Sequence, residues 1–279
     1  MAASGDGTVG KALEVLDHVA GFARPVRFAE LLATSPYPKA TLYRMLQTLT
    51  STRMLSFDDE RSTYAPGVRL VRLAHAAWSQ SSLAPIARAH LDALSLDLGE
   101  TVHLAQLDSG QVLYVDKRNA ARPVEMFSEA GKVGPAYCTG VGKAMLAYLP
   151  QDALADAILR QSFHRHTAHT LADPDALQAD LVAIRARGHA YDIEEHEVGI
   201  ICIAMPILTG SGRPLGAMSI TGTTNRITME GLEAYLPRLR HAAQAIAQDA
   251  SAWRFPDPSD APQRATATRT EPTSCQVLP

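Results

Sequence analysis

The spacing of apolar residues in the first third of the chain predicts three helices, over 9–20, 28–33 and 38–52. In each segment the apolar residues recur at helical intervals and share one face. Pro36 and Pro38 end the second helix, and Pro38 suits the first position of the third, where its missing N–H costs nothing. Two helices joined by so tight a turn predict a helix-turn-helix.

The residues after this unit predict a hairpin followed by more helix. Segments 54–57 and 62–65 have the composition of short strands, and the charged tetrad 58–61 forms the turn between them. A hairpin in this position is the wing of a winged helix. A further helix starts at Val68, and a long helix over 81–98 would connect the two halves of the chain.

The second half mixes strand and helix patterns, which predicts an α+β domain around one antiparallel sheet. The predicted strands cover 101–107, 111–116, 124–127, 188–191, 200–208 and 215–221, and the predicted helices cover 139–149, 151–161, 175–187 and 232–250. We therefore expect a disordered N-terminus (1–7), a winged helix-turn-helix domain (8–75), a linker helix (76–99), an effector-binding domain (100–252) and a disordered tail (253–279).

Composition narrows the class of protein. With 279 residues, 46% of them apolar and 20% charged, the chain has the composition of an ordinary two-domain globular protein. The net charge of −3 argues against a protein that coats nucleic acid. Residues 1–80 nevertheless hold nine Lys and Arg against seven Asp and Glu, whereas the remainder holds seventeen against twenty-two. This asymmetry permits a DNA-binding N-terminal end.

Cysteine usage and hydropathy indicate a cytoplasmic protein. Cys138, Cys202 and Cys275 show neither an even count nor CxxC spacing, so we expect no disulfide framework, no metal site and no cofactor. No apolar run approaches the ~18 residues that cross a bilayer, and the N-terminus lacks the basic and apolar regions of a signal peptide.

The polar face of the 38–52 helix is the first candidate site. It is free of acidic residues, and Lys39, Arg44 and Arg53 are the charged residues between positions 39 and 57. Hydroxyl, amide, phenol and cationic groups without negative charge suit the major groove of DNA. The alternative is an ordinary solvated helix face. The groups in question belong to Thr41, Tyr43, Arg44, Gln47, Thr48 and Ser51.

The second half offers less specific chemistry. Segment 191–199 is dense in ionisable groups, but its spacing matches no metalloenzyme motif, so a solvated loop is the simpler interpretation. Cys202, in an apolar strand, is a buried small residue, a pocket-lining residue or a nucleophile. Ser219 and Thr221 are two apart on a strand and therefore face the same side of the sheet.

A glycine-containing turn leads into the predicted helix at 139–149. Its spacing is not that of a P-loop, but free N–H groups at a helix start can bind an anion such as a carboxylate. Lys143, one turn into this helix, either adds charge to such a site or is simply solvated.

Four motifs resemble the IclR-type transcriptional regulators, in the right order along the chain. They are VGKALEVL (9–16), PKATLYRML (38–46), CTGVGKAMLA (138–147) and GIICIAMP (199–206), and the resemblance covers roughly residues 8–250. It implies a winged helix-turn-helix, a linker helix and a GAF-like domain that binds a small metabolite. It also implies dimers, often paired into tetramers, on palindromic operators.

The resemblance implies roles for particular residues as well. In the effector pocket the matching residues are Gly140, Val141, Asp192, Cys202, Ser219 and Thr221. The chain departs from the family pattern around the third helix. Pro36-Tyr37 replaces the usual Gly-Leu, Ala40 replaces Ser, and the usual glycine after the helix is replaced around Arg53-Met54.

These observations predict a homo-oligomeric, metabolite-responsive regulator, with repression of a small catabolic operon as the expected action. The effector would be a small organic or sugar acid. In the third helix, Thr41, Tyr43 and Arg44 would reach base edges, and the residues expected at phosphates or neighbouring bases are Lys39, Gln47 and Thr48.

Two alternatives stay open. One is a hydrolase that uses Cys202 with His196 or Asp192. The other is a ligand sensor that has lost DNA binding, which the Pro36-Tyr37 turn and the acidic tip of the predicted wing favour.

Overall fold

The computed structural model describes residues 7–122 and 126–252. Residues 1–6 of the predicted disordered N-terminus (1–7) and the predicted disordered tail (253–279) lie outside these described residues. So do positions 124 and 125 of the strand predicted over 124–127, whose described positions 126 and 127 are not in a strand. The chain divides into two compact units, Met1–Arg88 and Ala89–Pro279, each with its own core.

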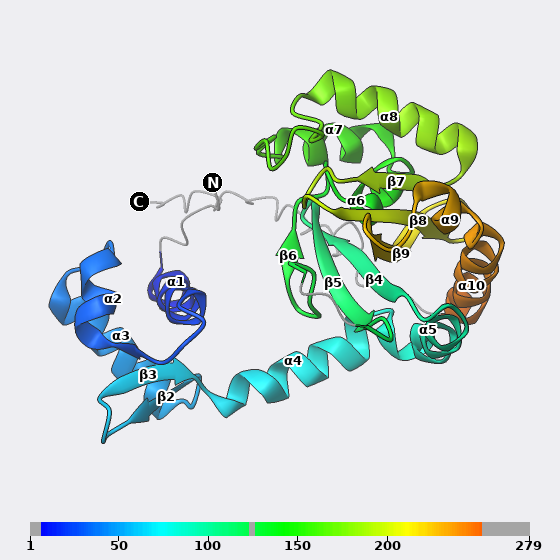
Figure 1. Ribbon diagram of the computed structural model, residues 1–279. Helices are drawn as coiled ribbons and strands as arrows, with labels where there is room; N and C mark the ends of the chain where they lie inside the picture. Colours follow the sequence, from blue (N-terminus) through cyan, green and yellow to red (C-terminus); the bar gives the residue numbers. More distant parts are fainter. Residues whose placement is uncertain (1–6, 123–125, 253–279) are drawn as a thin grey trace, which may run out of the picture. The chain divides into compact units, whose positions relative to one another are not determined.

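Within the first unit, residues 8–66 form three helices and a small antiparallel sheet of strand order β1-β3-β2 (Figure 1). The three predicted helices and the predicted hairpin are confirmed. Strand β1 was expected to be a connection, because two residues are too few to show a period. The elements are α1 (Thr8–Gly21), β1 (Val26–Arg27), α2 (Phe28–Thr34), α3 (Lys39–Ser51), β2 (Leu55–Asp58) and β3 (Thr63–Pro66).

The Pro36-Tyr37 turn fits this domain. The Ser35 hydroxyl accepts the N–H of Tyr37 at 3.1 Å, and the Tyr37 hydroxyl donates to Glu14 on α1. The Tyr37 ring lies against the core of the unit. The turn between α2 and α3 is therefore held by its own side chains despite its unusual sequence.

The linker helix predicted over 76–99 is not one helix: this range holds the end of α4 (Val68–Ser81) and all of α5 (Ala84–Leu98). Ser82, which has an extended backbone, ends α4, and its hydroxyl accepts the N–H of Ala84 at 3.1 Å. The expected single helix over 81–98 therefore starts three residues later. The predicted linker region, 76–99, therefore contains the break between α4 and α5 at Ser82.

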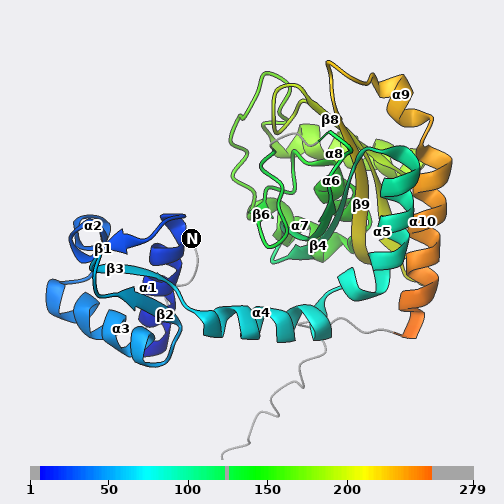
Figure 2. The same cartoon turned by 60° about the horizontal axis from the view of Figure 1, so that its bottom comes forward.

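The second unit is built on a six-stranded antiparallel sheet of order β6-β5-β4-β9-β8-β7. Figure 1 and Figure 2 show α5 and α10 side by side on one face of the sheet and α6 on the other. The strands are β4 (Thr101–Asp108), β5 (Gln111–Arg118), β6 (Val133–Gly134), β7 (Ala190–Ile193), β8 (Ile200–Leu208) and β9 (Pro214–Thr223).

The helices of this unit confirm the predicted pattern with changes at their ends. Gly188, at φ 82°, ends α8, so the strand predicted at 188–191 occupies Ala190–Ile193 instead. The helix predicted over 232–250 is split, because Pro237 lies in the first turn of a new helix. The helices are α6 (Gly140–Leu146), α7 (Gln151–Leu159), α8 (Pro174–Arg187), α9 (Met229–Glu233) and α10 (Leu236–Asp249), followed by a short 3-10 turn (Ala250–Ala252).

Within the described ranges, none of these helices is long and apolar enough to span a bilayer.

Candidate functional site

Helix α3 presents a polar face because its apolar residues are used elsewhere. Leu42, Met45, Leu46 and Leu49 are buried in the core of the first unit. On the other side Thr41 is half-buried, and the exposed side chains are those of Lys39, Tyr43, Arg44, Gln47 and Thr48. All six residues predicted to contact DNA thus lie on one helix, away from its buried stripe.

Contacts within this face order some of its side chains. The Gln47 amide donates a hydrogen bond to the Tyr43 hydroxyl at 2.8 Å, and the Tyr43 ring meets Phe28 edge-on with centroids 6.0 Å apart. The Thr48 hydroxyl donates to the backbone carbonyl of Arg44 at 3.0 Å. Within the described part of the chain no ion pair holds the Arg44 guanidinium, so it is free to bind a base or a phosphate.

One of the acidic groups at the tip of the wing has a local structural role. Oδ1 of Asp58 accepts the N–H groups of Glu60 at 3.0 Å and Arg61 at 3.1 Å, which closes the β2–β3 turn. Asp59 and Glu60 are exposed. The Asp58 carboxylate therefore stabilises the turn, whereas the exposed carboxylates of Asp59 and Glu60 have no such role in the turn.

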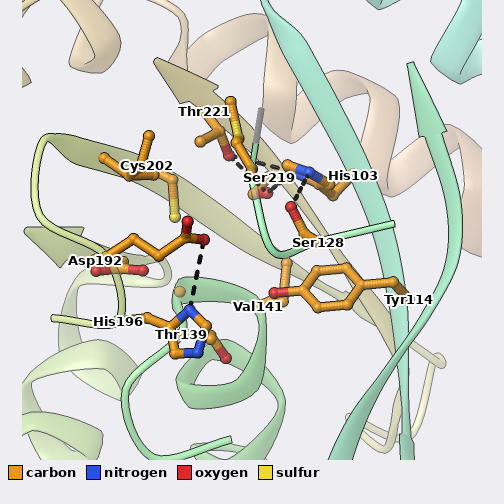
Figure 3. Close-up of a pocket in the computed structure, with 14 residues that line it drawn as sticks. His103, Tyr114, Ser128, Thr139, Val141, Asp192, His196, Cys202, Ser219 and Thr221 are labelled. Carbon is orange, nitrogen blue, oxygen red and sulfur yellow. Dashed lines mark hydrogen bonds and ion pairs between the residues drawn. The ribbon is translucent and has the colours of Figure 1, made fainter. Parts of the chain in front are cut away.

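The second candidate site is a cavity of about 30 Å³ between the sheet and α6 (Figure 3). Such a volume holds little more than one or two water molecules. All six residues predicted to contact the effector line it. The lining consists of His103, Tyr114, Met126, Ser128, Thr139, Gly140, Val141, Asp192, His196, Glu197, Ile200, Cys202, Ser219 and Thr221.

Strand register brings the predicted residues together. Asp192 on β7 pairs with Cys202 on β8, which pairs with Thr221 on β9. The Ser219 and Thr221 hydroxyls lie 3.4 Å apart, as their alternation on one strand predicts. Gly140 lets α6 approach this row, since a Cβ at Gly140 would lie 2.5 Å from the Cys202 sulfur.

A buried hydroxyl and imidazole cluster extends this row to β4 (Figure 3). Nδ1 of His103 lies 3.3 Å from the Ser219 hydroxyl and 3.2 Å from that of Thr221. Nε2 of His103 lies 2.7 Å from the Ser128 hydroxyl. Burial, with a smaller effect of Lys117, lowers the pKa of His103 to about 3, so the ring is neutral and has one donor and one acceptor nitrogen.

The structure disfavours Cys202 as a nucleophile. The thiol is buried, and burial, with the nearby Asp192 carboxyl, raises the pKa of Cys202 well above its usual value. A nucleophilic cysteine needs a lowered pKa and an adjacent base. His196 lines the same cavity, but its Nδ1 faces Glu197 Oε1 at 3.6 Å.

Asp192 is the most perturbed carboxyl in the cavity. It is buried, and burial, followed by the nearby carboxyl of Glu195, raises the pKa of Asp192 to about 7. Its Oδ1 accepts the N–H of Glu195 at 2.8 Å. The group is therefore able to exchange a proton near neutral pH.

Lys143 is buried, so the expectation that it is simply solvated was wrong, and although it does not line the cavity, its charge lowers the pKa values of Asp192 and Cys202 there. Its side chain is fully buried, and its ammonium group binds Glu195 Oε1 at 2.5 Å and Asp180 Oδ2 at 2.8 Å. Burial lowers the pKa of Lys143, but the two carboxylates outweigh burial and raise it, so the residue stays charged. It ties α6 to α8 and to the loop after β7.

Six polar lining residues were not predicted as binding residues: His103, Tyr114, Ser128, Thr139, His196 and Glu197. His103 lies in a predicted strand, where its alternation with Ala105 indicates a shared face, but alternation alone does not identify its partners. Nothing in the sequence near Ser128 signals a contact with β4. His196 and Glu197 belong to the ionisable segment 191–199, for which a solvated loop was the simpler interpretation.

Comparisons with known proteins agree with this architecture. Residues 8–59 match the family model of the IclR helix-turn-helix domain, and residues 75–248 match that of the bacterial transcriptional regulator IclR C-terminal domain. The HTH-type transcriptional regulator KdgR of Escherichia coli is 30% identical over 226 residues, which is 81% of this chain and 86% of that protein. The acetate operon repressor of Salmonella typhimurium is 30% identical over 220 residues, 78% of this chain and 80% of that protein.

The structure comparison leads to the same family. The crystal structure of the Thermotoga maritima IclR superposes with a TM-score of 0.71 at 29% identity, and the match covers 88% of this chain and 98% of that one. The fold is a winged helix-turn-helix unit with a GAF-like α/β effector domain, and related proteins are DNA-binding transcriptional regulators. The chain belongs to the IclR family of bacterial transcriptional regulators.

Proposed function

We propose that this regulator is a repressor that reads a palindromic operator with α3 and releases it, or binds it more tightly, when a small carboxylate occupies the cavity of the second unit. The observation that carries the DNA-binding half is the exposed α3 face, which bears cations, hydroxyls and an amide but no acid. An acid-free helix face can approach phosphates without repulsion and present donors to bases.

Specific roles follow from position on the helix. Thr41, Tyr43 and Arg44 lie in its first half, which in helix-turn-helix proteins contacts base edges. Gln47 is held against the Tyr43 hydroxyl, so the two side chains present one pre-oriented polar group. Lys39, at the start of α3, and Thr48, one turn before its end, are placed for phosphates or neighbouring bases.

A gel-shift assay on the region upstream of the protein's own gene tests this proposal. Arg44→Ala should weaken the specific complex about 10- to 100-fold, since a bidentate Arg–guanine contact contributes ~1–3 kcal/mol. Arg160→Ala is the matched control, because it removes the same charge from an exposed site in the other unit. Circular dichroism of both variants checks the fold.

Two other results would change the proposal. Equal affinity of the wild type and Arg44→Ala would remove α3 as the reading helix. A wild-type chain that binds ligand but shows no salt-dependent DNA affinity would be a sensor that has lost DNA binding.

The effector half rests on the cavity. Its lining includes Gly140 and Val141 at the start of α6 and the hydroxyls of Ser219 and Thr221, which are suited to hydrogen-bonding a small oxygen-rich molecule. Cys202 pairs with Asp192 on one side and with Thr221 on the other. The small volume favours a small organic acid over a larger sugar acid.

Oligomerisation would place two α3 helices on one operator. Helix α4 carries exposed apolar side chains at Val68, Val71 and Leu73, which another copy of the chain would cover. A dimer with two-fold symmetry matches a palindrome with half-sites about one helical turn apart. The same proposal includes domain boundaries at 75/76 and 99/100. It also includes a cytoplasmic location and a function that is not enzymatic.

A further inference from the structure

The cavity has an unusual charge balance for a site that takes an anion. Among the described residues that line it none is Lys or Arg, and the imidazole of His196 already faces Glu197, with Nδ1 3.6 Å from Oε1. Glu197 is anionic, because His196 and the backbone N–H of Phe127, whose nitrogen lies 3.1 Å from Oε1, lower the pKa of Glu197. The His103 ring is neutral.

The two basic side chains that act on Asp192, Lys143 and His196, already have carboxylate partners. The Lys143 ammonium group contacts both Glu195 and Asp180, and His196 faces Glu197. A carboxylate effector next to an ionised Asp192 would therefore meet a second negative charge with no cation assigned to either. In a buried site such a like-charge pair is strongly unfavourable, and one member of the pair takes up a proton.

Asp192 is placed to be that member. Oδ1 accepts the backbone N–H of Glu195, and the Asp192 side chain lines the cavity beside Cys202 (Figure 3). A protonated carboxyl can keep this bond and donate its O–H to a ligand oxygen. The groups that act on it come from every neighbouring element: Cys202 on β8, Lys143 on α6, Cys138 before α6, Tyr114 on β5, and Glu195 and His196 in the loop after β7.

We propose that Asp192 recognises the effector as a neutral carboxylic acid that donates a hydrogen bond, so that each carboxylate bound brings one proton with it. The proton comes from solvent and stays on Asp192, and the effector remains an anion. The inference rests on the proposed effector site and adds a selection rule. Monocarboxylates bind when Asp192 is protonated. Uncharged analogues bind without the uptake of a proton by Asp192.

The pH dependence follows from this linkage. In the free protein the pKa of Asp192 is about 7, so the competent protonated form predominates below pH 7 and is lost above it. The apparent Kd of a monocarboxylate should be nearly constant below pH 6 and should rise about tenfold for each pH unit between 8 and 9. The effector carboxyl, with an ordinary pKa near 4, stays ionised throughout this range.

The test is titration calorimetry of the full chain with acetate, glycolate and lactate, and with lactamide as an uncharged analogue of lactate. At pH 8, measurements in Hepes and in Tris, whose ionisation enthalpies differ, should give close to one proton taken up per carboxylate bound. This measurement needs no variant. Lactamide should give no proton uptake.

Asp192→Asn supplies the second arm, because the amide keeps an acceptor oxygen and a donor but has no charge to lose. The variant should bind the same acid with a Kd independent of pH from 6 to 9, at least tenfold more tightly than the wild type at pH 8.5. Asp108→Asn, an exposed carboxylate at the β4–β5 turn, should keep the wild-type pH slope.

The outcomes separate the two proposals. An acid that binds with the same affinity from pH 6 to 9 and without proton uptake overturns the role of Asp192 and leaves the effector site intact. Affinity that rises with pH shows an ionised Asp192 that accepts a hydrogen bond, and also overturns it. If none of the acids binds at any pH, the proposed effector class fails as well.

Discussion

Gly140 shows how one residue without a side chain sets the shape of the cavity. A Cβ at this position would lie 2.5 Å from the Cys202 sulfur and 3.2 Å from the Ala204 Cβ, so α6 touches β8 through backbone atoms. Close approach is a more direct reason for glycine here than backbone freedom. The same contact explains why a sulfur with a raised pKa is enclosed rather than reactive.

We expect Gly140→Ala to lower the free energy of unfolding by about 1–3 kcal/mol, because an overpacked core must shift α6 or the strand. Chemical denaturation measures this loss. Gly210→Ala is the matched control, since nothing lies within 4 Å of a Cβ there, and it should change stability by less than about 0.5 kcal/mol. Adding Cys202→Ala to Gly140→Ala should recover part of the loss, and strictly additive effects would contradict the contact.

At the scale of elements, the buried Lys143 connects three segments. Its ammonium group bonds to Asp180 on α8 and Glu195 after β7, and Asp180 also binds Arg187 at 3.1 Å. A buried ion pair adds little net stability compared with apolar residues of the same size. Its stronger effect is to fix how α6 sits against α8, and therefore where the cavity floor lies.

Lys143→Met should destabilise the second unit by about 3–5 kcal/mol, because it leaves the buried carboxylate of Glu195 without a counter-charge. Denaturant unfolding followed by circular dichroism measures the change. Lys11→Met, on an exposed position of α1, is the control and should have an effect below about 0.5 kcal/mol. If both variants are equally stable, the ion pairs do not hold α6 in place.

At the scale of the whole molecule, the proposed function requires coupling between the cavity and α3. An effector changes DNA affinity only if it binds two states of the protein unequally, and the coupling is reciprocal. The two compact units each fold around their own core, so a change in one can leave the other intact. Variants of the cavity should therefore separate response from DNA binding.

The double variant Ser219→Ala with Thr221→Val removes two cavity hydroxyls and keeps most of the side-chain volume. We expect its ligand-free operator affinity to stay within about twofold of the wild type, whereas the change in affinity caused by a bound acid should disappear. Fluorescence anisotropy with labelled operator, with and without the acid, measures both. Thr209→Val, at the β8–β9 turn, should retain the full response, and an unaltered response in the double variant would place the effector elsewhere.

Local patterns were sufficient for much of the fold. Helices α1, α2 and α3 and the β2–β3 hairpin follow from apolar spacing and turn residues, because each is stabilised by neighbours close in sequence. The alternation of Ser219 and Thr221 gave their common face for the same reason. The motifs that resemble the family assigned Asp192 and Cys202 to the predicted site, whereas composition and spacing alone did not decide the role of either residue.

The sequence by itself determined which elements form, which face of each is polar, and the family to which the chain belongs. Only the tertiary structure decided that Lys143 is buried between two acids and that His103 meets Ser128 and the β9 hydroxyls. The spacing of apolar residues along a helix or strand shows which face of that element is buried. The protonation and the partners of a buried polar group depend instead on residues 25 to 118 positions away, which strand register and helix docking bring into contact.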